Sequence, residues 1–205
     1  PDEIGYLNGF SHLCFDELVK GKDRVIKSEY GDKLLLLFDE TVWVPFYMYH
    51  KQLMMCYDIM TYANMGDDTT TASIKAQAES MFLLAANWAK ERVLNYTAKE
   101  KGMAEAMYAA YRVSLKNSEI DEAKDYLRAA RFFEEDYFLE AIHEDSNLLP
   151  GIHVNTAIPK FIGCCAAYES TGDTFYLETA QKAWDMMVDH MTMSNGGISS
   201  IGEHY

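Results

Sequence analysis

The sequence predicts an all-α protein whose helices form hairpins in two layers, an inner layer and an outer one. Three observations predict this fold class. Only 4 of the 205 residues are proline, three segments are apolar all around a helix, and each of these precedes a polar break and an amphipathic helix. A helix that is apolar all around must be enclosed, whereas an amphipathic helix can face water.

Three repeats define the expected elements. The apolar inner segments are residues 53–60, 103–111 and 161–168, and the polar breaks that follow them are residues 64–70, 116–119 and 169–173. The repeat is longer than a tetratricopeptide repeat, so it favours either a larger α-solenoid or a closed (α/α) toroid. Three hairpins are too few to close a ring of six.

The outer helix after the third break has the clearest amphipathic pattern. Its apolar residues recur at helical spacing and are Ala180, Ala183, Trp184, Met187, Val188 and Met191. We therefore expect Trp184 to lie in the core. The same is expected of Trp88, which falls on the apolar face of an earlier outer helix.

The connecting segments carry their own signals. Residues 39–45 contain a proline and β-branched residues, so they predict a loop or strand before the first inner helix. Asn155 or Thr156 is the expected N-cap of the third inner helix. Pro159 is expected near the start of that helix, where its missing N–H costs nothing. The glycine-rich tail, residues 194–205, predicts a loop or short strand.

Charge and cysteine usage limit the class of ligand. The net charge of −14 repels phosphate, so neither nucleic acid nor an anionic membrane surface is an expected partner, whereas a neutral polar ligand is compatible. No segment has transmembrane length. The cysteines lack metal-type spacing and predict buried thiols. Cys164 and Cys165, as helix neighbours, point about 100° apart and cannot clamp one ion.

Polar side chains gather at the N-terminal ends of the expected inner helices. They are His50, Glu105, His153 and Asn155, and in a toroid these ends would share one rim. From the residues alone, a structural or capping role is favoured for His50, Glu105 and His153. Asp58, inside an apolar segment, needs either a partner or a polar cavity.

Five ordered motifs together resemble one family of enzymes. They are Gly5–Phe10 (GYLNGF), Trp43–Lys51 (WVPFYMYHK), Gly151–Lys160 (GIHVNTAIPK), Tyr168–Leu177 (YESTGDTFYL) and Gly196–Tyr205 (GGISSIGEHY). This order is similar to that of glycoside hydrolase family 127 and its relative family 146, the β-L-arabinofuranosidases of bacteria. The resemblance covers nearly the whole chain.

The resemblance implies an (α/α)6 toroid, followed by β-sandwich domains, that hydrolyses β-L-arabinofuranosides with retention. It implies a Cys nucleophile held on zinc by two further Cys and a Glu. Glu203 matches the family's acid/base. His50 and His153 match histidines expected on the sugar hydroxyls, with Asn155 beside His153. The implied partner is an arabinose-containing oligosaccharide or glycan.

The chain also departs from the family pattern. The family's zinc motifs follow the acid/base Glu, whereas here only two residues follow Glu203. Residues 1–205 are therefore expected to form the central part of the barrel, about three to four hairpins, without its first helices and without the zinc segment. We expect no metal site in this chain, zinc in the full-length enzyme, and no activity from this chain alone. Ala104 and Ala157 replace a family Asn and Gln.

Two other function classes stay open at this stage. One is a different carbohydrate-active enzyme on the same toroid, such as an epimerase or an unsaturated uronyl hydrolase. The other is a non-catalytic αα-hairpin binding module, which would present a surface groove in place of a closed funnel. The sequence leaves open both a homo-oligomer and the compartment, bacterial cytoplasm or periplasm.

Overall fold

A computed structural model describes residues 5–7, 45–95, 103–198 and 204 of the chain. Within these residues the regular structure is helical, apart from one isolated β-bridge. The helices are α3 (Pro45–Tyr62), α4 (Asp68–Val93), α5 (Ala104–Lys116), α6 (Ile120–Phe132), α7 (Asp136–His143), α8 (Val154–Thr171) and α9 (Thr174–Met191). The all-α prediction is confirmed. No helix in the described ranges is long and apolar enough to span a membrane.

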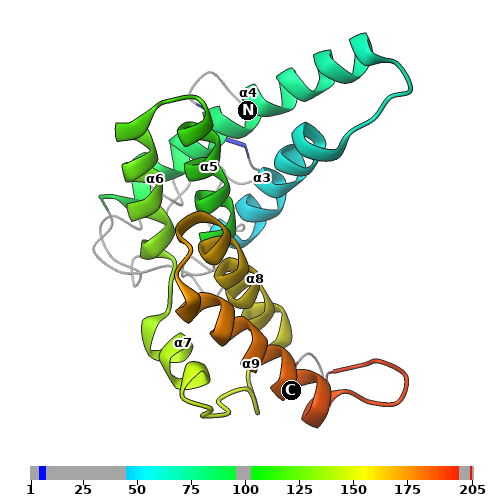
Figure 1. Cartoon of the computed structure of the whole chain (residues 1–205), viewed down its shortest axis with the longest axis vertical. Helices are drawn as coiled ribbons and strands as arrows, with labels where there is room; N and C mark the ends of the chain where they lie inside the picture. Colours follow the sequence, from blue (N-terminus) through cyan, green and yellow to red (C-terminus); the bar gives the residue numbers. More distant parts are fainter. Residues whose placement is uncertain (1–4, 8–44, 96–102, 199–203, 205) are drawn as a thin grey trace, which may run out of the picture.

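The helices pair as the sequence pattern predicts. The chain forms the hairpins α3–α4, α5–α6 and α8–α9, and α5 also packs against both α3 and α8. The first helices of the three hairpins therefore stand side by side as an inner row, with α5 in the middle (Figure 1). The short helix α7 packs against α9, outside this row.

The helix boundaries follow from local side-chain chemistry. The Asp67 carboxylate accepts a hydrogen bond from the Thr70 N–H at 2.6 Å and caps α4, and Asp173 caps α9 by accepting from the Phe175 N–H at 3.0 Å. Each bond satisfies a free N–H of the first helical turn. Gly172 ends α8 with a φ of 71°, a left-handed conformation that suits glycine. All three predicted breaks occur, but they are shorter than predicted, at residues 63–67, 117–119 and 172–173.

The apolar core joins the inner row to the outer helices. On α3 the buried face consists of Phe46, Tyr49, Leu53 and Cys56, and Trp88 of α4 is also buried, as predicted. The Tyr49 hydroxyl donates to the Ala85 carbonyl at 2.9 Å. A second apolar cluster lies between α7, α8 and α9. The core therefore fixes the relative positions of the inner helices, which carry the polar groups considered below.

The prediction that Trp184 lies in the core is wrong, because 64% of its surface is exposed. The buried face of α9 is formed by Thr179, Ala183, Met186 and Met187. Trp184 and Val188 lie at the flank of this face, where helical spacing continues the apolar stripe but no described element covers it. Periodicity identifies the apolar side of a helix, but it does not show how far the neighbouring helices reach.

The expectations for the start of α8 are also wrong. The N-cap is His153, and its side chain makes no capping hydrogen bond. Pro159 lies in the second turn of the helix, where its ring removes the N–H that would bond to the Asn155 carbonyl. The loss of this bond has a cost that a proline in the first turn would not have.

The structure also bears on the expectations for Asp58 and for residues 39–45. Asp58 is exposed on α3, so water solvates it and no buried partner is needed. Pro45 is the first residue of α3, whereas residues 39–44 lie outside the described ranges.

Candidate functional site

Two inner helices bring together the first pair of polar residues. His50 lies in the second turn of α3 and Glu105 in the first turn of α5, and His50 Nε2 is 2.8 Å from Glu105 Oε2. The side chain of His50 is 3% exposed and that of Glu105 is 22% exposed. Sequence reasoning expected the His50 ring on the sugar, but the structure buries this ring and leaves the carboxylate as the more accessible member of the pair.

A close helix contact fixes the position of Glu105. Gly163 of α8 faces the start of α5, and a Cβ atom at Gly163 would lie 3.2 Å from the Ala104 Cβ. The absence of a side chain at Gly163 therefore allows α5 to approach α8 closely at this level. The same approach places Glu105 near Cys165, since the two groups interact electrostatically.

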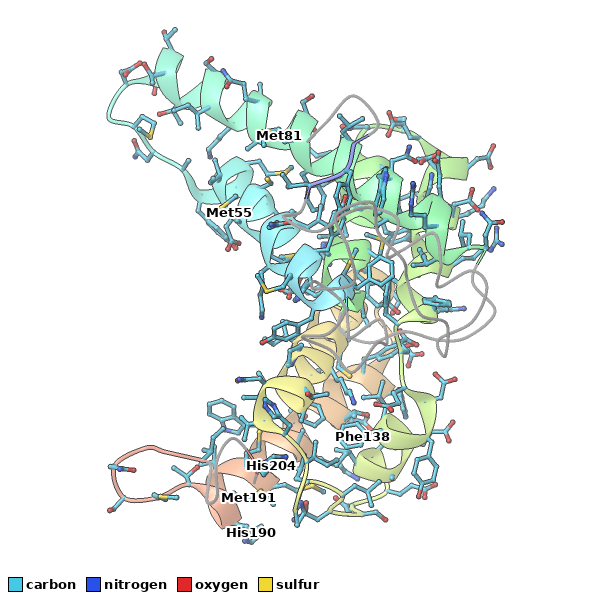
Figure 2. The ribbon with its side chains drawn as sticks, turned by 180° about the vertical axis from the view of Figure 1, so that it is seen from behind. Met55, Met81, Phe138, His190, Met191 and His204 are labelled. Carbon is cyan, nitrogen blue, oxygen red and sulfur yellow. The ribbon has the colours of Figure 1, made fainter. Side chains whose placement is uncertain are left out.

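The second pair of polar residues lies at the start of α8. His153 and His204 form an isolated antiparallel bridge, and their ring centroids are 5.4 Å apart in an edge-on arrangement. His204 thus lies beside the N-terminal end of α8 (Figure 2). Glu203, the expected acid/base, precedes His204 in the sequence and lies outside the described residues.

Asn155 lies in the first turn of α8, two residues after His153, and is exposed. Because Pro159 has no N–H, the Asn155 backbone carbonyl lacks its usual helical donor. The start of α8 therefore offers an amide side chain, a backbone acceptor and an imidazole within a short stretch. These are the groups that hydrogen-bond neutral hydroxyls.

The two pairs lie at different levels along α8. The backbone N of Glu105 lies beside Gly163, which is ten residues further along α8 than His153. At a rise of 1.5 Å per residue this corresponds to about 15 Å. The single rim expected from the sequence is thus, in the described part of the chain, two polar positions along the inner helices.

The cysteines differ in their environments. Cys56 and Cys164 are buried free thiols, and burial, followed by the charge of Glu134, raises the pKa of Cys164 to about 12. Cys165 is exposed, so the prediction that it is buried is wrong. Neighbours on a helix point about 100° apart, and only one of the two can face the core. Cys14 lies outside the described residues.

The described cysteines do not form a metal site. Burial raises the pKa of Cys165, and the charges of Glu169 and Glu105 add to this effect. Both neighbouring thiols are therefore protonated at neutral pH, and a thiol is a weaker nucleophile than a thiolate. Among the residues that the structure covers, no group of three or more His, Cys, Asp or Glu side chains is placed to hold a metal ion.

One buried network was missed by sequence reasoning. Glu134, in the turn between α6 and α7, accepts hydrogen bonds from the hydroxyls of Tyr108 in α5 and Tyr176 in α9, the latter at 3.1 Å. Burial raises the pKa of Glu134 even though both hydroxyls oppose the shift. Glu134 lies in a polar break and its partners are distant in sequence, so no local pattern could have indicated the network.

Comparison with known proteins gives a match over nearly the whole chain. Residues 2–205 match the family model described as the β-L-arabinofuranosidase, glycoside hydrolase family 127 catalytic domain. No curated protein matches the sequence.

Proposed function

The chain belongs to the family of glycoside hydrolase family 127 catalytic domains, and on this premise we propose that it is the central part of a barrel that cleaves terminal β-L-arabinofuranosides with retention. The observation that carries the proposal is the family match over residues 2–205. The helical hairpins support it, since an inner row of helices backed by outer ones is the arrangement of a toroid segment.

Glu203 is the proposed acid/base. In a retaining glycosidase such a group protonates the leaving oxygen and then removes a proton from the attacking water. The Gly202–Tyr205 motif supports this role. The contact of His204 with His153 supports it further, because it brings the residue after Glu203 to the polar start of α8.

His153 and Asn155 are the proposed contacts of the sugar near Glu203. Both lie at the start of α8, and Asn155 is exposed there. An amide and an imidazole can each donate and accept hydrogen bonds, which suits sugar hydroxyls. The high negative charge of the chain is compatible with a neutral substrate and unfavourable for an anionic one.

The nucleophile and its zinc ion are proposed to belong to a part of the enzyme other than this chain. Among the described cysteines, Cys56 and Cys164 are buried and Cys165 is exposed, and no described cluster of donors is placed for a metal. No step of the reaction is therefore assigned to a described cysteine. We expect the chain alone to be inactive and the protein that contains it to require the second catalytic group.

A hydrolysis assay tests the proposal. The complete protein that contains this chain should release p-nitrophenol from p-nitrophenyl β-L-arabinofuranoside, and Glu203→Gln should lower the rate roughly 10²–10⁴-fold, the usual contribution of general acid–base catalysis. The matched control is Glu122→Gln, which removes the partner of Lys90 between α6 and α4. Absence of turnover, or a Glu203→Gln variant as active as the control, would contradict the proposal.

A further inference from the structure

We propose that Glu105 is a sugar-contacting residue on the inner side of the helix row and that the buried His50 is the positioning residue that holds its carboxylate. The inference rests on the proposed glycosidase function for the class of ligand, a neutral pentose or pentoside. It reverses the roles expected from the sequence, where His50 met the sugar and Glu105 was structural.

The first argument is the difference in burial within the pair. Only 3% of the His50 side chain is exposed, against 22% of the Glu105 side chain. The His50 Nε2 atom bonds to Glu105 Oε2, and its Nδ1 atom is buried with no hydrogen-bond partner in the described structure. The ring therefore has no accessible atom left for a ligand.

The second argument is the hydrogen bond between the two residues. His50 Nε2 lies 2.8 Å from Glu105 Oε2, and a carboxylate oxygen can only accept, so the imidazole N–H donates to it. A donor from α3 thus fixes one carboxylate oxygen on α5, and the described residues make no hydrogen bond to the other oxygen, Oε1.

The third argument is the surface beside Glu105. The exposed side of α8 at this level carries Cys165, with Ile162 one turn before it and Glu169 one turn after it. Ile162 supplies apolar surface for the carbon face of a sugar, and the carboxylate of Glu105 supplies an acceptor for its hydroxyls. Hydrogen bonds to an ionised acceptor are about twice as strong as those between neutral groups.

Charge narrows the class of sugar. Glu105 and Glu169 both contribute negative potential at Cys165. Arg112, the nearest described cation to Glu169, is engaged with that carboxylate at 3.5 Å and with the Ser170 hydroxyl at 2.8 Å. The Glu105 carboxylate would therefore repel a carboxylate on the ligand, so this position selects a neutral pentose over a uronic acid.

The competing interpretation is that the pair only joins α3 to α5. If the pair were purely structural, replacing either Glu105 or His50 would make the protein less stable and would leave the sugar affinity of the folded protein unchanged. A ligand-contacting Glu105 makes the opposite prediction, since Glu105→Gln keeps the shape of the side chain but removes the charge that strengthens the hydrogen bonds to the sugar.

The experiment compares four variants of the complete protein: Glu105→Gln, His50→Leu, His50→Gln and the control Glu122→Gln. Binding of L-arabinose is measured by titration calorimetry, and KM and kcat are measured on the aryl arabinofuranoside. We expect Glu105→Gln to weaken L-arabinose binding and raise KM about tenfold, the factor that corresponds to one charged hydrogen bond of about 1.5 kcal/mol, with kcat changed less.

His50 supplies the second arm of the experiment. His50→Leu removes the donor and should weaken binding as Glu105→Gln does, whereas His50→Gln keeps an N–H donor and should restore most of the affinity. In the His50→Leu background, Glu105→Gln should add little, since the two residues act as one unit. Thermal unfolding of every variant shows whether a loss of affinity comes from loss of folding.

The outcomes separate this inference from the proposed function. If the protein binds L-arabinose through Glu105 but does not hydrolyse the arabinofuranoside, the inference stands and the proposed reaction fails. If the protein hydrolyses the arabinofuranoside while Glu105→Gln keeps KM and L-arabinose affinity within twofold of the control, the inference is overturned. The inference is also overturned if Glu105→Gln changes the affinity for a uronic acid and the affinity for L-arabinose by the same factor.

Discussion

At the scale of single residues, Glu134 shows how a partly buried carboxyl can join successive hairpins. Its two oxygens accept from Tyr108 of the second hairpin and Tyr176 of the third. Burial is the largest cause of its raised pKa, and Asp136 adds to it. The negative charge of Glu134 also contributes to raising the pKa of Tyr176, after burial, to about 12. The junction is therefore most stable when the carboxyl is neutral.

The pH dependence of stability follows from this shift. The folded protein holds the Glu134 proton more tightly than the unfolded chain, so this group contributes stability below its unfolded pKa and loses it as pH rises through the folded pKa. Glu134→Gln removes that loss. We expect the difference in unfolding free energy between variant and wild type to move in favour of the variant as pH rises from about 4, near the unfolded pKa of Glu, to neutrality.

Urea unfolding at a series of pH values measures this difference. Glu140→Gln on the exposed side of α7 is the matched control, because it removes a carboxylate from the neighbouring helix without a buried partner. Parallel pH curves for wild type and Glu134→Gln would show that the buried network does not titrate as described.

At the scale of helices, the sequence predicted where the helices break better than it predicted which of their residues are covered by neighbouring helices. The breaks after Tyr62, Lys116 and Thr171 depend on nearby polar and glycine residues, so they are visible in the local sequence. The exposure of Trp184 and Cys165 depends on which neighbours reach the flank of a helix, and periodicity does not contain that information. The family motifs indicated His50, and the helix pattern alone placed Glu105 at the same expected rim, but only the contact between α3 and α5 showed which of them is more accessible.

The turn between α8 and α9 gives a prediction at this scale. Gly172 has a φ of 71° and open space around the position of a Cβ atom, so the cost of a side chain there is conformational and not steric. We expect Gly172→Ala to lower the free energy of unfolding by about 1 kcal/mol. Thr174→Ala, at the exposed start of α9, is the control. A Gly172→Ala variant as stable as this control would show that the turn relaxes without strain.

At the scale of the whole molecule, the inner helices form a row with two unequal ends (Figure 1). At the α3 end, Met48, Met55 and Tyr62 are exposed, and Met55 is marked on that helix in Figure 2. In the hairpin at the other end, α8–α9, Trp184 and Val188 are exposed on the outer helix α9. In the proposed toroid these two flanks would each be covered by a neighbouring hairpin, since a row of hairpins buries its sides only when the next one packs against it.

This arrangement predicts how the chain behaves when it is produced alone. Large apolar side chains left exposed at a flank promote association, so we expect the isolated chain to form oligomers as its concentration rises. Trp184→Gln should shift this equilibrium toward the monomer without lowering thermal stability, because Trp184 is 64% exposed and contributes little to the core. Sedimentation velocity over a range of concentrations measures the shift. Tyr137→Gln is the matched control, since Tyr137 is 76% exposed but lies on α7, which belongs to none of the three hairpins. If the wild-type chain stays monomeric throughout, or if Tyr137→Gln has the same effect as Trp184→Gln, the α9 flank is not an interface and the toroid loses this support.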